Sequence, residues 1–357
     1  MAMRVGVRAV TLKMVATDAG VSVPTVCHVL RGRARMMRIS VQSEQRIQEA
    51  ARRLGYIGNY HAQALVTRAT RAIGLTTSQG RSAFLGSIRW SQLVAGIEVQ
   101  VRVHGYDLHL IGGGQVEDIP QLGYDQLMAR RIDSLIMLPA IHLQLPKVLL
   151  QPKLPVVFIE PLAPPGCTST GLDPLPGLEE AVLHLQALRH RCISWCSTTI
   201  DHPMIDQRRT HLRRVAQGLG LDFEEFIIPT SLPDTHQTED TLNPLLECMQ
   251  RQFRPSPRTT AIVCFNDAVA LALMKVLKVQ GVDVPEAVSV IGFDDLFAQF
   301  AIPALTTISH RFFDIGASAV DLAYALATGA APKVPARVLL PSRLVVRSST
   351  APRRSGP

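Results

Sequence analysis

From Ala72 onward, short apolar runs rich in β-formers alternate with segments of helical periodicity. Parallel strands that are covered by helices on both faces produce this alternation. The pattern therefore predicts a doubly wound α/β region, in which ligands bind beyond the carboxyl ends of the strands. The expected strands are Ala72–Thr77, Tyr106–Ile111, Asp133–Leu138, Pro155–Glu160, Cys192–Cys196, Thr260–Cys264 and Val288–Gly292.

The chain has 357 residues, which is enough for two or three domains. Its apolar runs are far shorter than the roughly 20 residues that cross a bilayer. Arg4 and Arg8 interrupt the apolar N-terminus, so we expect no secretory signal and a cytoplasmic, nucleoid-associated protein. The six cysteines show no CxxC spacing, which is typical of reduced thiols.

Pro161–Pro176, rich in Pro and Gly, is expected to be a surface crossing between two lobes.

The positive charge is concentrated at the N-terminal end of the chain. The net charge of the whole chain is +8, from 37 basic and 29 acidic residues. The segment before Ala72 holds twelve of the basic residues and three of the acidic ones, and therefore carries +9. The remainder is nearly neutral. This asymmetry predicts a small module that binds phosphates, joined to a large body with a different task.

The basic segment has the pattern of a helix-turn-helix. Apolar residues at helical spacing follow Thr11, an N-cap type, and Gly20 ends this first helix. Ser22 is placed to cap a second helix that runs to about Leu30. In this motif the second helix enters the major groove of DNA. A third helix is expected between Ser40 and Gly55.

This segment resembles the DNA-binding headpiece of the lactose-repressor (LacI/GalR) family. The matching strings are Thr11–Ala16, Ala19–Ser22, Thr25–Leu30 and Ala50–Tyr56, followed by Asn59–Leu65, which resembles the hinge helix of the family. The resemblance implies that Leu65 wedges into the central minor groove when the hinge folds on DNA. The predicted DNA-binding residues are Thr11, Ser22, Val23, Pro24, Thr25, Cys27, His28, Arg31, Asn59, His61, Ala62 and Leu65.

The large region resembles the effector-binding core of the same family, most specifically in Thr260–Asp267, Gly281–Asp295 and Pro303–Ile308. The resemblance implies an all-α headpiece and a core of two Rossmann-like lobes, similar to periplasmic sugar-binding proteins. The expected domains are a headpiece (9–57), a hinge (58–70), a core (71–348) and a tail (349–357). Lobe 1 is expected at about 71–172 and 303–333, and lobe 2 at about 173–302 and 334–348.

Matching positions of the family imply an effector site that is suited to a sugar or a sugar acid. Carboxylates and an amide exchange hydrogen bonds with hydroxyls, a guanidinium binds a diol or a carboxylate, and an indole covers an apolar ring face. Each of these residues also has a purely structural interpretation, as a helix cap or as core. The predicted effector-binding residues are Ser78, Trp90, Glu160, Arg208, Asn266 and Asp294.

The chain departs from the family pattern at several positions. Gly58 stands where the hinge usually has Pro, and Arg189 stands where a glycine usually ends a helix. Arg33, Arg35 and Arg38 lie in a loop that is longer than usual, within reach of backbone phosphates. These departures concern the hinge, a helix end and the reach of the headpiece.

No catalytic constellation is present: the chain lacks GxGxxG, GxSxG, HExxH and P-loop motifs. We therefore predict a regulator and no enzyme, with no cofactor, metal or membrane partner. The expected partners are a pseudo-palindromic DNA operator, a carbohydrate-like effector and a second copy of the chain. The alternatives are a periplasmic-type binding protein without a DNA function and a sugar-modifying enzyme.

Overall fold

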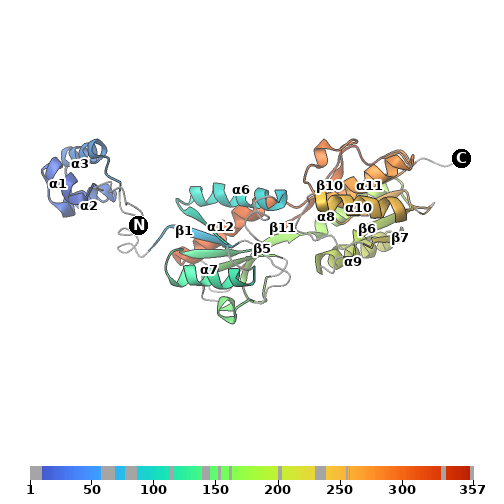
Figure 1. Cartoon of the computed structure of the whole chain (residues 1–357), viewed down its shortest axis with the longest axis horizontal. Coiled ribbons are helices and arrows are strands. Elements are labelled where there is room, and N and C mark those ends of the chain that lie inside the picture. Colours follow the sequence, from blue (N-terminus) through green and yellow to red (C-terminus); the bar gives the residue numbers. More distant parts are fainter. Residues whose placement is uncertain are drawn as a thin grey trace, which may run out of the picture. The chain divides into compact units, whose positions relative to one another are not determined.

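The protein is described from a computed structural model of the full chain (Figure 1). The chain forms two compact units, and the boundary between them in the sequence lies between Thr70 and Arg71. Among the described residues, no helix is long and apolar enough to span a membrane. The structure describes residues 10–57, 69–76, 87–112, 116–138, 145–151, 154–160, 163–199, 203–229, 239–254, 256, 258–330 and 335–353.

The first unit is a three-helix headpiece whose helices begin and end where the capping residues predict. The side chains of Thr11, Ser22 and Ser40 each accept a backbone N–H of the first helical turn. Gly20 and Gly55 end the first and third helices in the left-handed conformation. The helices are α1 (Leu12–Ala19), α2 (Val23–Leu30) and α3 (Val41–Leu54).

A small apolar cluster holds these three helices together. Val15, Val26 and Ile47 come from different helices and are fully or almost fully buried. An ion pair between Arg53 and Asp18 ties α3 to α1 at the surface. The predicted helix-turn-helix and third helix are therefore present.

The second unit contains two six-stranded sheets. The first has the order β11-β5-β4-β3-β1-β2, and all of its strands run parallel. Helices α6 (Ile88–Val103) and α12 (Phe312–Thr328) pack on one face, and α7 (Ile119–Met128) lies on the other (Figure 1). The strands are β1 (Ala72–Thr76), β2 (Asp107–Ile111), β3 (Ser134–Met137), β4 (Val156–Ile159), β5 (Thr168–Asp173) and β11 (Arg337–Pro341).

The second sheet has the order β12-β10-β9-β8-β6-β7 and is parallel except for the antiparallel edge strand β12. Helices α8 and α9 pack together on one face, and α10 and α11 pack together on the other (Figure 1). The strands are β6 (Cys192–Thr198), β7 (Asp222–Ile228), β8 (Ala261–Cys264), β9 (Ser289–Asp294), β10 (Thr306–Ser309) and β12 (Arg343–Val345), and the helices are α8 (Leu175–Ala187), α9 (Pro203–Gly218), α10 (Glu239–Gln252) and α11 (Asp267–Val279).

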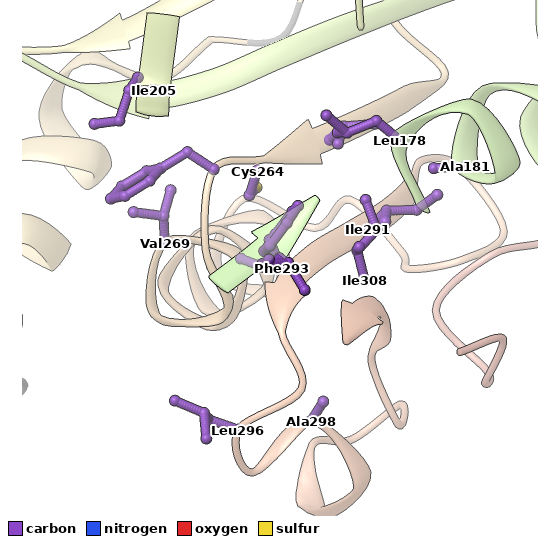
Figure 2. Packing of buried hydrophobic residues seen from close by; sticks show 14 of the residues in the cluster. Leu178, Ala181, Ile205, Cys264, Val269, Ile291, Phe293, Leu296, Ala298 and Ile308 are labelled. Carbon is purple, nitrogen blue, oxygen red and sulfur yellow. The ribbon is translucent and has the colours of Figure 1, made fainter. Parts of the chain in front are cut away.

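Apolar side chains fill the space between the second sheet and its helices. Figure 2 shows Phe293 and Ile291 of β9 among Ile308 of β10 and Leu178 of α8. Phe293 is fully buried, and burial of a side chain of this size contributes about 2 to 3 kcal/mol. This packing makes the strand ends, where the candidate site lies, a rigid support.

Two strands lie in the opposite lobe to the one predicted. β10 pairs with β9 in the second sheet, although 303–333 was assigned to lobe 1, and β11 pairs with β5 in the first sheet, although 334–348 was assigned to lobe 2. The chain therefore crosses between the sheets after β5, after β10 and after β11. The prediction was wrong because strands this short carry no local signal that tells which distant strand they pair with.

Pro161–Pro176 is more than a surface crossing, because it contains the buried strand β5. Its sequence, Thr-Ser-Thr-Gly-Leu-Asp, has no apolar run to predict a strand. Hydrogen bonds make its burial possible: the Ser169 hydroxyl donates to Glu160 at 2.9 Å, and the Thr170 and Ser318 hydroxyls lie 2.9 Å apart.

Candidate DNA-binding face and effector site

The first turn of α2 presents the residues predicted to meet base edges. Val23 and Pro24 are exposed. The Ser22 hydroxyl accepts the Thr25 N–H and lies 2.8 Å from the Thr25 hydroxyl, so these two side chains stabilise the start of the helix. Thr11 does the same for α1, where its hydroxyl accepts the Met14 N–H. Thr11 and Ser22 thus act as helix caps in this structure, and contact with DNA remains a prediction for both.

The later part of α2 carries Cys27 and His28, which are both partly exposed. The His28 Nδ1 atom is buried and has no hydrogen-bond partner within the described part of the chain. Arg31 follows as the C-cap of the helix. An imidazole and a guanidinium on this helix are suited to the acceptor groups of bases and phosphates.

A basic loop, residues 31–39, joins α2 to α3. Ala34 is buried in the headpiece cluster and anchors the loop, and Ile39 packs against the same cluster. The loop folds back on itself, since the Ile39 N–H donates to the Ala34 carbonyl at 3.0 Å. The side chains of Arg33, Arg35, Met36, Met37 and Arg38 are exposed.

Five predicted site residues lie outside the described part of the chain. They are Asn59, His61, Ala62 and Leu65 of the hinge segment, and Ser78 after β1. Their roles stay predictions from the family resemblance.

Asp294 joins the two sheets of the core. It ends β9 with a positive φ of 117°, a conformation that a side chain adopts only when its surroundings hold it. Its carboxylate lies 3.4 Å from Arg89 Nη2, at the start of α6, and 3.1 Å from His310 Nδ1, just after β10. Because α6 begins beyond the carboxyl end of β1, this contact brings together the carboxyl ends of both sheets. We call Arg89, Asp294 and His310 the Asp294 cluster.

Charge and burial oppose each other in this cluster. Burial raises the pKa of Asp294, but Arg89, His310 and Arg208 outweigh burial and hold that pKa below its ordinary value. Burial lowers the pKa of His310, and the neighbouring Asp294 opposes this only in part. At neutral pH the cluster therefore holds an ionised carboxylate and a neutral imidazole.

Arg208 reaches the same strand ends from α9. Its guanidinium carbon lies 3.5 Å from the centroid of the Phe293 ring, and its Nη1 donates to the Phe265 carbonyl at 2.9 Å. Asn266 follows Phe265 and caps α11, where its Oδ1 accepts the Val269 N–H. Arg208, Asn266 and Asp294 therefore lie at one edge of the second sheet, and contact with an effector remains a prediction for all three.

Trp90 and Glu160 have other partners in this structure. Trp90 is buried in the apolar cluster of the core beside α12. Glu160 accepts the Arg337 guanidinium and the Ser169 hydroxyl, both at 2.9 Å, and so ties β4 to β5 and β11. Contact with an effector remains a prediction for both residues.

Sequence reasoning missed Arg89, His310 and Asp267. Asp267 is buried and accepts the Leu296 N–H at 2.7 Å and the Thr307 hydroxyl at 2.5 Å. Burial, with the charge of Asp294, raises its pKa well above the ordinary value. His310 follows β10, a strand that the periodicity did not predict. Arg89 stands next to Trp90 in the first turn of α6. A positive charge at that position was the one feature of the sequence that could have pointed to Arg89 as a site residue.

The Asp294 cluster combines a carboxylate with an imidazole and a guanidinium. Within the described ranges, no group of three or more His, Cys, Asp or Glu side chains is placed to hold a metal ion. What the geometry provides is a set of charged hydrogen-bonding groups at the meeting point of two sheets. Together with the helix-turn-helix, it defines the class: a DNA-binding regulator with a two-lobe ligand-binding core.

Comparisons with known proteins agree with this class. Residues 11–59 match the bacterial regulatory proteins of the lacI family, and residues 182–350 match the periplasmic binding protein-like domain. The HTH-type transcriptional regulator GalR of Salmonella typhimurium (strain SL1344) is 30% identical over 322 residues, which cover 89% of each chain. The chain belongs to the lacI family of bacterial regulatory proteins, and it is a DNA-binding transcriptional regulator.

Two solved structures extend the comparison to the whole fold. The lac repressor dimer bound to operator and the anti-inducer ONPF has a TM-score of 0.74 and 24% identity, and covers 96% of this chain and 100% of that one. The complex of the regulator CelR with cellobiose has a TM-score of 0.63 and 25% identity, and covers 95% and 99%. The predicted headpiece and two-lobe core are confirmed.

Proposed function

We propose that this regulator is a repressor that binds a pseudo-palindromic operator as a homodimer, and that a carbohydrate-like effector at the Asp294 cluster controls its affinity for DNA. The observation that carries the proposal is the contact between Arg89 and Asp294. One residue belongs to α6 on the first sheet and the other to β9 in the second, so a ligand that binds Asp294 acts on both lobes at once. By linkage, the effector and the operator change each other's affinity by the same factor.

The chemistry of the cluster favours a ligand rich in hydroxyl groups. The carboxylate, imidazole and guanidinium of the cluster, with the amide of the neighbouring Asn266, accept and donate the hydrogen bonds that a sugar offers. CelR, a relative of similar fold, is known in complex with the sugar cellobiose. An enzyme of sugar metabolism is the less favoured alternative, because the relatives named above are regulators. We propose a cytoplasmic location for the protein, since that is where its DNA operator would be.

The proposed dimer is supported by an apolar surface just beyond Asp294. Phe297, Phe300 and Ile302 have exposed fractions of 54%, 72% and 91%, and such a group of large apolar side chains marks an interaction site. A two-fold dimer also presents two copies of α2, as a palindromic operator requires. The lac repressor of similar fold is a dimer on its operator.

The test begins with duplexes selected from a random-sequence pool by the full-length protein. We expect enrichment of an inverted repeat, and we expect sedimentation to give two protein chains per duplex. His28→Ala should relax the preference at one position of each half-site, whereas Lys278→Gln on the exposed side of α11 should leave it unchanged. The proposal fails if no duplex is enriched, or if the enriched site has no symmetry and binds one chain.

A further inference from the structure

A buried hydroxyl at the carboxyl end of β6, in the second sheet, has no hydrogen-bond partner among the described residues. Thr198 ends β6 and is 3% exposed. Its Oγ1 atom has no hydrogen-bond partner in the part of the chain that the structure describes. A buried polar group in this state costs about 1 to 3 kcal/mol, so its presence calls for a partner beyond the described part of the chain.

The register of the sheet places Thr198 in line with the candidate effector residues. β6 pairs Cys196 with Cys264 of β8, and the ladder continues where the Phe265 N–H donates to the Cys196 carbonyl at 2.9 Å. When this register is continued two residues beyond its last pair, Thr198 falls opposite Asn266, the N-cap of α11. On the other side of β8, Val263 pairs with Ile291, which brings Asn266 level with Asp294. With both registers continued past their last pairs, Thr198, Asn266 and Asp294 fall in one row, and successive strands of a sheet lie about 4.8 Å apart.

Side chains in one row of a parallel sheet point to the same face. Asn266 caps α11, so the row of Thr198 faces the side of α10 and α11. The neighbouring row holds Ser197, Phe265 and Phe293, and Phe293 contacts Arg208 of α9 on the opposite face. Ser197 also has a buried hydroxyl without a partner among the described residues, but it faces the side of α8 and α9.

We propose that the Thr198 hydroxyl is a further effector-binding group, which hydrogen-bonds a hydroxyl of the carbohydrate that Asn266 and Asp294 also contact. The inference rests on the proposed function, since it adds a third polar group to the same strand edge. A hydroxyl both donates and accepts, so it suits a sugar hydroxyl of either orientation. The effector then removes the cost of the orphaned group when it binds.

Thr198→Val separates this role from a structural one, because it keeps the shape of the side chain and removes the oxygen. We expect the variant to be at least as stable as the wild type to urea, while its affinity for the effector falls about three- to twelve-fold, the equivalent of one hydrogen bond. Thr198→Ser restores the hydroxyl and should restore the affinity. Ser197→Ala removes the orphaned hydroxyl of the opposite face and should leave effector affinity unchanged.

The probes are glucose, galactose, cellobiose and maltose, each titrated calorimetrically into the full-length protein. The inference is overturned if a sugar binds the wild type and Thr198→Val equally well, or if Ser197→Ala weakens binding as much as Thr198→Val does. If the protein binds its selected duplex but none of the sugars, the carbohydrate part of the proposed function fails, and the inference fails with it. If it selects no duplex and yet binds a sugar through Thr198, only the DNA part of the proposed function fails.

Discussion

Arg89 and Asp294 lie 205 residues apart in the sequence, and their side chains meet at 3.4 Å to link the first sheet to the second. Both side chains are largely buried. When one partner of a buried ion pair is removed, the other charge stays behind without compensation, which costs about 3 to 5 kcal/mol.

Arg89→Leu should therefore destabilise the core by at most that amount, because His310 and Arg208 still face Asp294, and the double variant Arg89→Leu with Asp294→Asn should be less destabilised than the single variant. Urea unfolding of both variants and of Asp294→Asn alone gives the coupling energy. Strictly additive costs would show that the two charges do not interact.

The second prediction concerns the packing of α6 against α12. A β-carbon on Gly96 would collide with the backbone carbonyl of Phe313, and one on Gly316 would collide with the carbonyl of Leu93. A backbone carbonyl cannot swing aside as a long side chain does. Gly96→Ala should therefore force the helices apart and lower the free energy of unfolding by about 3 kcal/mol.

Gly218 at the end of α9 provides the matched control. A β-carbon there meets nothing within 4 Å. Gly218→Ala should leave stability unchanged or raise it by up to about 1 kcal/mol. Equal urea midpoints for the Gly96 and Gly218 variants would contradict the close approach of the two helices.

The third prediction concerns pH. Burial lowers the pKa of His310 below its ordinary value of 6.5, so below pH 6.5 the unfolded chain takes up a proton that the folded chain does not. The folded state is then destabilised as the pH falls from 7 to 5, by at most about 1.4 kcal/mol per pH unit for one group. His310→Gln should make the stability less dependent on pH in this range.

His109→Gln is the control variant, because it makes the same substitution at a histidine that is exposed in β2 and not buried. Asp294 does not contribute to the pH dependence between pH 7 and pH 5, because its pKa lies below the ordinary value and its carboxylate stays ionised over this range. Thermal unfolding from pH 7 to pH 5 gives the three slopes. The prediction is wrong if the slope of His310→Gln equals that of the wild type.

The fourth prediction concerns the basic loop, residues 31–39. Arg33, Arg35 and Arg38 are exposed, and the loop is anchored by the buried Ala34. If each arginine binds one phosphate, changing all three to Gln should weaken binding to specific and non-specific duplexes alike. The slope of log K against log salt should become shallower by about 0.9 for each phosphate that the variant no longer binds.

Arg251→Gln is the control variant. It also removes a positive charge at an exposed position, but in α10 of the other unit and not in the basic loop. Fluorescence anisotropy over a range of KCl concentrations measures the slopes. An unchanged slope in the triple variant would place the loop away from DNA.

Much of the secondary structure could be predicted from local patterns. The caps Thr11, Ser22 and Ser40 were visible because a capping side chain and the N–H that it accepts lie within one turn of each other. The strands with continuous apolar runs were visible for a similar reason. Arg189, which stands where the family has a helix-ending glycine, does adopt a positive φ of 66°. These features depend on neighbours in the sequence.

The candidate site was only partly accessible to the same reasoning. Asn266 and Asp294 were found by their positions after strands and by family resemblance, and Arg208 by family resemblance alone; contact with an effector remains a prediction for each. Glu160 was found by the same rule, yet its partner Arg337 comes from a strand that the periodicity did not predict. His310 had no signal, because the strand before it was not predicted. Thr198 follows a predicted strand but was not singled out, because a lone polar residue at a strand end looks the same whether it is paired or orphaned.

The amino-acid sequence alone determined the two-part plan of this protein: a cationic helix-turn-helix and a body of alternating strands and helices, since charge and periodicity are read from residues close together in the chain. Tertiary structure decided which sheet each short strand joins and which charges meet. Arg89 reaches Asp294 only after the chain has crossed between two sheets, and burial there, rather than residue type, makes that pair and the Thr198 hydroxyl energetically important.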